Sequence, residues 1–295
     1  MQYASNDGYR EEKSAVADIS EEPTKIRDGW DELSDMYQEV LTAESSGRHR
    51  INQRRSVLRL VPKNGVGAEI GVFTGLFAPV LDEICKPTKL YLVDPWDKLH
   101  GTHFPDWGAY TNQVRVPTAG AKKAAELRAS YMSCMAEVVT AFSGEWLKTQ
   151  NKGALDWVYL DANHKFDEVL SDLRDIDAVL AENGIILGDD AWVQKTGEIN
   201  GVCEALYTFC REQNYLIIHL DGHGQWAIKR TRDVIKVVPA DAEPASEPET
   251  IEMSNVTGIA DSTSNREAVE TSDIKPAAQP AGFVARLRGL FKVFE

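Results

Sequence analysis

A short apolar run, Trp157-Val158-Tyr159-Leu160, is followed directly by the polar run Asp161-Ala162-Asn163-His164. A second apolar run, Ile185-Ile186-Leu187-Gly188, leads in the same way into Asp189-Asp190. Apolar runs of this length are typical of buried strands, and the carboxyl ends of neighbouring parallel strands meet at one edge of their sheet. The sequence therefore predicts that three carboxylates and one imidazole converge at this edge.

Strand-like and helix-like segments alternate on both sides of these two runs. The expected strands are 67–72, 89–93, 137–142, 156–160, 184–187, 215–220 and 226–230, and the expected helices include 77–84, 119–134, 166–181 and 201–213. Helical periodicity also begins near Trp30, breaks off after Leu41 and resumes over residues 51–60. Such alternation predicts βαβ units, and the turn-rich Asp221-Gly222-His223-Gly224 between the last two strands favours an antiparallel hairpin. We expect an α/β fold: a Rossmann-like, doubly wound, mostly parallel seven-stranded sheet with an antiparallel edge hairpin.

Acidic residues gather in the flanks of the chain. Residues 1–35 hold ten acidic and four basic residues, and residues 239–280 hold nine and two, within a formal net charge of -14 over 295 residues. We therefore expect a disordered acidic arm at 1–30, a folded domain at 31–238 and a disordered acidic linker at 239–280. The nearly neutral centre lacks the basic face that nucleic-acid binding needs, so we expect no nucleic-acid partner.

The last residues, 281–295, place apolar side chains at helical spacing opposite three basic ones. This pattern predicts an amphipathic helix that could lie on an anionic membrane surface, dock on a partner, or pack against its own domain. The protein is expected to be cytoplasmic for three reasons. Its cysteines are scattered, its N-terminal sequence lacks the pattern of a signal peptide, and it has no apolar run long enough to span a membrane. The sequence indicates nothing about the oligomeric state.

A glycine-rich turn, Glu69-Ile70-Gly71-Val72-Phe73-Thr74-Gly75, follows the first expected strand. Its glycines would let a ligand approach the backbone and the free N–H groups of the next helix. The second expected strand ends at Asp94, and a carboxylate at this distance from such a turn can accept both hydroxyls of a ribose. The alternative role for Asp94 is a helix cap or a turn former. Together the turn and the acid favour a nucleoside cofactor.

The two aspartate-containing strand ends favour a metal site. Asp161, Asp189 and Asp190 offer the oxygen ligands that hard divalent cations prefer, and His164 offers a titratable base beside them. Taken singly, each aspartate could cap a helix, and His164 could be an ordinary surface histidine. Their joint occurrence at two strand ends favours the metal.

These motifs carry a resemblance to a known family. Glu69-x-Gly71-x-x-x-Gly75 followed by Asp94 resembles the cofactor half of class I S-adenosylmethionine-dependent methyltransferases. Asp161-x-x-His164 and Asp189-Asp190 resemble the metal half of their cation-dependent O-methyltransferase branch, and the macrocin-type enzymes are the most similar within it. The resemblance covers roughly residues 60–230.

The resemblance implies that S-adenosylmethionine is the cofactor. Glu69, Gly71 and Gly75 would shape its methionine pocket, and Asp94 would hold its ribose. Ser143, after the third expected strand, matches a position that often contacts adenine.

The resemblance also implies a metal-assisted reaction. Asp161, Asp189 and Asp190 would ligate Mg²⁺ or another divalent cation, and His164 would be the general base. The expected function is therefore metal-dependent O-methylation of a hydroxyl on a small molecule or sugar. Two alternatives remain: the same fold and metal site with non-methylating, hydroxylase-like chemistry, or a non-catalytic binding or scaffold protein that uses its C-terminal helix.

A loop rich in Trp, His and Tyr follows Asp94. Such a loop at the carboxyl edge of a sheet is a plausible substrate lid. The side chains that could stack on an acceptor, or only pack the loop onto the domain, are Trp96, His100, His103, Trp107 and Tyr110. Trp192, after the paired aspartates, is a further candidate for the wall of the acceptor pocket.

Overall fold

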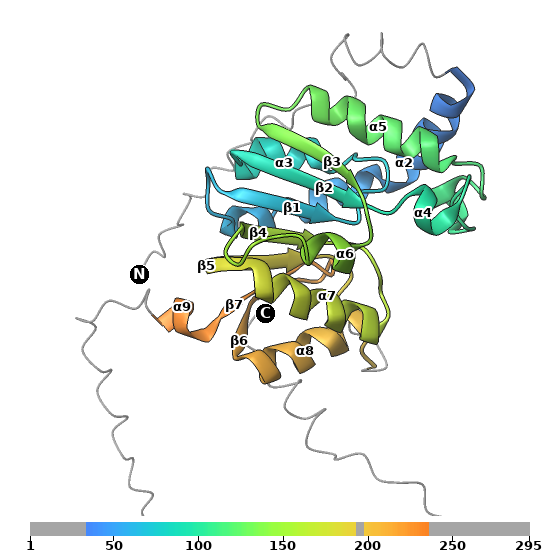
Figure 1. The fold of residues 1–295 in the computed structure, drawn as a ribbon. Coiled ribbons are helices and arrows are strands. Elements are labelled where there is room, and N and C mark those ends of the chain that lie inside the picture. The colour runs from blue at the N-terminus through green and yellow to red at the C-terminus, as the bar shows by residue number, and fades with distance from the viewer. Residues whose placement is uncertain (1–33, 193–197, 236–295) are drawn as a thin grey trace, which may run out of the picture. The chain divides into compact units, whose positions relative to one another are not determined.

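A single sheet with the strand order β3-β2-β1-β4-β5-β7-β6 organises the computed structural model, which describes residues 34–192 and 198–235 (Figure 1). The strands are β1 (Val66–Ile70), β2 (Lys89–Asp94), β3 (Met135–Thr140), β4 (Leu155–Leu160), β5 (Leu180–Gly188), β6 (Tyr215–Leu220) and β7 (Trp226–Arg230). The strands from β3 to β5 pair in parallel, whereas β7 runs antiparallel to both β5 and β6. The predicted α/β, Rossmann-like fold with an antiparallel edge hairpin is confirmed.

Helices cover both faces of this sheet (Figure 1). The α-helices are α2 (Ser34–Arg54), α3 (Ala78–Cys85), α4 (Asp97–His100), α5 (Thr118–Ser130), α6 (Ser143–Leu147), α7 (Phe166–Val179), α8 (Gly201–Gln213) and α9 (Thr231–Ile235). Two 3₁₀ helices, η1 (Val57–Leu60) and η2 (Gly108–Thr111), lie in the connections. None of the described helices is long and apolar enough to cross a membrane.

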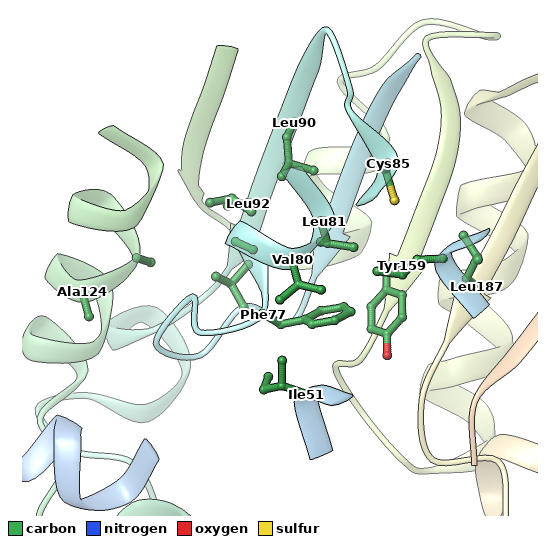
Figure 2. Packing of buried hydrophobic residues seen from close by; sticks show 14 of the residues in the cluster. Ile51, Phe77, Val80, Leu81, Cys85, Leu90, Leu92, Ala124, Tyr159 and Leu187 are labelled. Carbon is green, nitrogen blue, oxygen red and sulfur yellow. The ribbon is translucent and has the colours of Figure 1, made fainter. Parts of the chain in front are cut away.

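Strand β4 shows why the core has two halves. Its side chains alternate between the faces of the sheet, so Trp157 and Tyr159 join the cluster under α2, α3 and α5, whereas Val158 joins the cluster under α7 and α8. Both halves are closed to water, as expected for a parallel sheet with helices on each face. Figure 2 shows Phe77 between Tyr159 and Ile51 of α2, with ring centroids of Phe77 and Tyr159 4.7 Å apart. Helix α2 is therefore part of the core.

Several elements differ from the sequence prediction. Strand β3 spans Met135–Thr140 instead of the expected 137–142. Strand β5 begins at Leu180, four residues before the expected 184–187, and helix α5 ends at Ser130, four residues before the expected end of 119–134. Helix α2 continues without a break to Arg54, although the apolar periodicity stopped after Leu41. The reason is that buried polar side chains occupy the inner face of its second half: Glu44 is 2% exposed and Arg54 6%. The predicted segments 1–30, 239–280 and 281–295 lie outside the described residues.

A tight contact between β1 and β4 gives a test of the fold. A Cβ atom at Gly67 would overlap the indole ring of Trp157, which is fully buried in the neighbouring strand. We expect Gly67→Ala to lower the free energy of unfolding by about 1–3 kcal/mol, because overpacking forces the core apart. Gly222→Ala is the control, since nothing lies within 4 Å of its added Cβ, and its effect should stay within about 0.5 kcal/mol. Equal effects in denaturant titrations would contradict this packing.

Candidate functional site

A cavity of about 1050 Å³ opens at the carboxyl ends of β1, β2, β4 and β5. Most of the predicted site residues contribute to its lining, namely Glu69, Gly71, Asp94, Ser143, Asp161, His164 and Asp190. Gly75 and Asp189 are outside that lining. The position agrees with the general rule that ligands of open α/β sheets bind beyond the carboxyl ends of their strands.

Asp94 holds the glycine-rich turn in place. Its Oδ2 accepts the backbone N–H groups of Val72 and Phe73, each at 2.9 Å, and its Oδ1 accepts the N–H of Trp96 at 2.9 Å. Burial raises the pKa of Asp94, although the three N–H donors act in the opposite direction. The carboxylate thus ties the end of β2 to the turn after β1, and its contact with a ribose remains a prediction.

The two glycines of the turn are required by close packing. Gly71 has a φ of 90°, and an added Cβ would overlap the backbone carbonyl of Asp161. Gly75 has a φ of 76°, and its Cβ would lie 2.8 Å from the Cα of Ala125 in α5. Only glycine adopts these conformations without strain. Gly71 thereby brings the turn against the end of β4, and Gly75 brings it against α5.

Glu69 lies at the inner end of the cavity. The residue is only 1% exposed, and its Oε2 has no hydrogen-bond partner among the described residues. Burial raises the pKa of Glu69 well above its ordinary value, and the nearby Arg54 guanidinium acts against this shift. Because a buried carboxylate oxygen without a partner is uncommon in proteins, this atom is a candidate contact for a ligand.

Asp161, His164 and Asp190 come together as predicted from their strand ends. One potential ligand atom from each lies within 4.8 Å of the others. The Nε2 of His164 is 3.0 Å from the Oδ2 of Asp190, and this contact raises the pKa of His164. Two carboxylates and an imidazole at this spacing are a suitable donor set for a divalent cation.

Two arginines that sequence reasoning missed also reach this group. Arg54 Nη2 lies 2.7 Å from Asp161 Oδ2 and 2.6 Å from Asp189 Oδ2. Arg50 Nη2 lies 2.8 Å from Asp189 Oδ2 and 2.6 Å from Asp190 Oδ1. Both arginines come from α2, four residues apart on one helical face, and that spacing was the available signal. They offset much of the negative charge and compete with a cation for the same oxygens.

Asp189 is more deeply buried than Asp161, His164 and Asp190. Its side chain is fully buried, and its Oδ2 accepts from both arginines. Its Oδ1 accepts from the Gln225 amide at 2.5 Å and from the backbone N–H of Asp190 at 2.7 Å. Both oxygens are thus engaged with protein donors, and ligation of a metal by Asp189 remains a prediction.

Ser143 is the first residue of α6 and lines the cavity. Its hydroxyl donates to the Oδ1 of Asp172 in α7 at 2.6 Å. Asp172 also contributes to the cavity lining and was not predicted from the sequence. Burial raises the pKa of Asp172 to about 6, and the Ser143 hydroxyl limits this rise. The contact of Ser143 with adenine remains a prediction.

The aromatic loop divides into two parts. Trp96 is fully buried and donates its indole N–H to the Phe73 carbonyl at 2.7 Å, so it cannot stack on an acceptor. In contrast, Trp107 and Tyr110 contribute to the cavity lining and pack on Phe73, with ring centroids at 6.4 and 5.1 Å. His100 packs on Trp107 and also contributes to the lining.

The cavity lining does not include His103, which is exposed and forms an isolated β-bridge with Pro117. Trp192 is likewise outside it, and its indole N–H donates to the Oδ1 of Asp190 at 3.0 Å. Trp192 thus helps to fix the orientation of the Asp190 carboxylate.

The raised pKa of Asp172 predicts a pH-dependent stability. Its pKa is about 6 in the folded protein and near the ordinary 3.8 in the unfolded chain, so ionisation destabilises the fold. This cost is absent well below pH 3.8, grows between pH 3.8 and 6, and is constant above that. We expect Asp172→Asn to raise the melting temperature more at pH 7.5 than at pH 4. Asp167→Asn, an exposed position in the first turn of α7, should show no such gain. A pH-independent effect of Asp172→Asn would contradict the burial of a charge here.

Residues 67–191 match a family model described as a methyltransferase domain. No curated protein matches the chain. The match spans the glycine-rich turn, the end of β2 and both aspartate-containing strand ends.

Several solved structures share low overall similarity with the chain. A putative rRNA-methylase from Clostridium thermocellum is 11% identical, with 61% of this chain and 95% of that chain covered and a TM-score of 0.42. The N-methyltransferase NodS from Bradyrhizobium japonicum WM9 is 15% identical, with 62% and 96% covered and a TM-score of 0.40. TYW2 from M. jannaschii, in complex with AdoMet, is 15% identical, with 61% and 72% covered and a TM-score of 0.36. These names describe the neighbours alone. The family match supports a methyltransferase domain over residues 67–191.

Proposed function

We propose that this protein is a metal-dependent O-methyltransferase that transfers the methyl group of S-adenosylmethionine to a hydroxyl of a small molecule or sugar. The observation that carries the proposal is that Asp161, His164 and Asp190 line the same cavity as Glu69 and the glycine-rich turn. Two carboxylates for a cation, a candidate base and a candidate nucleoside pocket thus share one space. Its volume of about 1050 Å³ is at the upper end of the usual range for small-molecule sites, which suits a cofactor and an acceptor together.

The proposed reaction needs a hydroxyl to become a better nucleophile. A divalent cation held by Asp161 and Asp190 would stabilise the acceptor oxyanion and so lower the pKa of the hydroxyl. His164 would accept the proton at Nδ1, because its Nε2 faces Asp190, whose carboxylate stabilises the imidazolium that forms. The acceptor oxygen then bonds to the methyl carbon as the bond from carbon to the sulfonium breaks, which leaves S-adenosylhomocysteine.

The remaining predicted roles fit this arrangement as part of the proposal. Asp94 and Ser143 would lie along the adenosine, while the wall formed by Phe73, Trp107 and Tyr110 would face the acceptor. Aromatic side chains pack equally well against a sugar ring and an aromatic ring, so the acceptor is defined here only as a ring that carries a hydroxyl. Asp189 could become a third ligand only if the arginines release its Oδ2.

The direct test is an assay with purified protein, methyl-labelled S-adenosylmethionine, Mg²⁺ and a panel of phenols, catechols and sugars, read by mass spectrometry. We expect label on an acceptor oxygen. Replacement of His164 by Ala should lower turnover by about 10²–10⁴-fold, the usual contribution of a positioned base, with cofactor affinity unchanged. His223→Ala is the control, since this exposed histidine lies outside the cavity. Undiminished turnover of His164→Ala would reject His164 as the base.

The arginines make a prediction about metal affinity. Arg50 pairs with Asp189 and Asp190, so Arg50→Gln should leave the group more negative and tighten Mn²⁺ binding by about tenfold. Arg55→Gln is the control, because Arg55 pairs with Glu83 on the surface, and it should leave the affinity unchanged. Calorimetric titration with Mn²⁺ alone measures both. Unchanged or weaker binding to Arg50→Gln would show that the cation does not bind at these carboxylates.

A further inference from the structure

We infer that Arg54 binds the carboxylate of the methionine part of S-adenosylmethionine, while Glu69 faces its ammonium group. This inference rests on the cofactor of the proposed function and adds a residue from α2 to its binding site. It starts from two buried side chains that line the same cavity, one basic and one acidic, each with one polar atom left without a partner among the described residues.

Two carboxylates hold the guanidinium group of Arg54 in place. Its Nη2 is engaged by Asp161 and Asp189, and its guanidinium lies 5.3 Å from the ring centre of Phe77. The side chain is only 7% exposed, and its Nε–H donor has no hydrogen-bond partner among residues that the structure describes. The orientation of the guanidinium is therefore fixed before any ligand binds, with one charged donor still to be satisfied.

Glu69 supplies the hydrogen-bond acceptor for the cationic group of the ligand. Its Oε2 is a buried acceptor without a donor, at the end of β1 where the glycine-rich turn begins. A single ligand can satisfy both atoms if it carries an anionic acceptor for Arg54 and a cationic donor for Glu69. An α-amino acid has this pair of groups on one carbon atom, and the methionine part of S-adenosylmethionine is an α-amino acid.

Arg50 differs from Arg54 in the features that matter here. It lies one helical turn earlier and pairs with the same Asp189, but its side chain is 28% exposed and its Nη2 contacts the carboxylates of Asp189 and Asp190. It is therefore the matched control: a second α2 arginine on the same acidic group, without an unpartnered buried donor.

The experiment compares three ligands by calorimetry: S-adenosylhomocysteine, its decarboxylated analogue, which keeps the amine, and 5′-methylthioadenosine, which lacks the amino acid. Each is titrated into the full chain and into its Arg54→Lys and Arg50→Lys variants. Lysine keeps a cation for Asp161 and Asp189 but has no Nε–H, so Arg54→Lys removes the proposed contact with limited disturbance of the ion pairs.

For the natural chain, loss of the ligand carboxylate should weaken binding by about tenfold to a hundredfold, as expected for a charged hydrogen bond. In Arg54→Lys, S-adenosylhomocysteine and its decarboxylated analogue should bind with nearly equal affinity, and methylthioadenosine should bind as it does to the natural chain. Arg50→Lys should keep the natural preference. The inference is overturned if Arg54→Lys weakens the binding of all three ligands equally. It is also overturned if Arg54→Lys fails to fold and the natural chain binds the first two ligands with equal affinity.

The outcome also separates this inference from the proposed function. If the natural chain binds S-adenosylhomocysteine with the predicted carboxylate preference but methylates no hydroxyl, the O-methyltransferase proposal fails and the role of Arg54 stands. If an acceptor is methylated while Arg54→Lys keeps the full preference for the ligand carboxylate, the role of Arg54 fails and the proposed function stands. A carboxylate on the acceptor as the partner of Arg54 would give this second result.

Discussion

The guanidinium of Arg54 lies between the carboxylates of Asp161 and Asp189, and the site depends on this contact. The two strands β4 and β5 end side by side, so their aspartates approach each other in a largely buried region. Buried like charges repel strongly unless a counter-charge is supplied, and removal of one partner from such a group leaves an uncompensated charge. Helix α2 supplies that counter-charge. This explains why α2, which precedes the sheet in sequence, packs at the carboxyl edge of the sheet.

A second buried ion pair holds α2 in that position. Arg128 of α5 donates from its two terminal nitrogens to the carboxylate of Glu44 at 2.7 and 2.9 Å, and also to the Thr74 carbonyl in the glycine-rich turn at 2.7 Å. Bidentate pairing of this kind fixes orientation as well as distance. Helix α2, helix α5 and the turn are therefore connected by one guanidinium. Four buried side-chain polar atoms lack a hydrogen-bond partner among the described residues, and of these only the atoms of Arg54 and Glu69 belong to residues that line the cavity.

The sequence predicted the fold well because its signal is local. The apolar runs of the parallel strands are buried on both faces, as in Trp157 to Leu160, and the polar residues that follow them mark the carboxyl edge without reference to any other segment. The positions of Asp161, His164 and Asp190 at one cavity follow from the strand order, so they too could be predicted.

The contacts with α2 could not be predicted in the same way. Arg50 and Arg54 lie more than a hundred residues before their partners. Their spacing places both on one helical face, but it does not identify those partners, because a charged side chain in a helix is normally exposed to solvent. Trp96 illustrates the same limit: a tryptophan in a loop beside the site suggested a stacking surface, but its indole N–H is used to fix the Phe73 carbonyl. Which polar atoms are satisfied depends on tertiary contacts, and only the structure reveals those.

The central claim is that the cavity at the carboxyl edge binds S-adenosylmethionine beside the acidic group of β4 and β5. A crystal structure of the protein with S-adenosylhomocysteine tests it most directly. We expect the adenosine along Asp94 and Ser143, the ammonium group against Glu69, and the sulfur directed toward Asp161 and His164. Electron density for the ligand outside this cavity, or with its sulfur directed away from the aspartates, would contradict it.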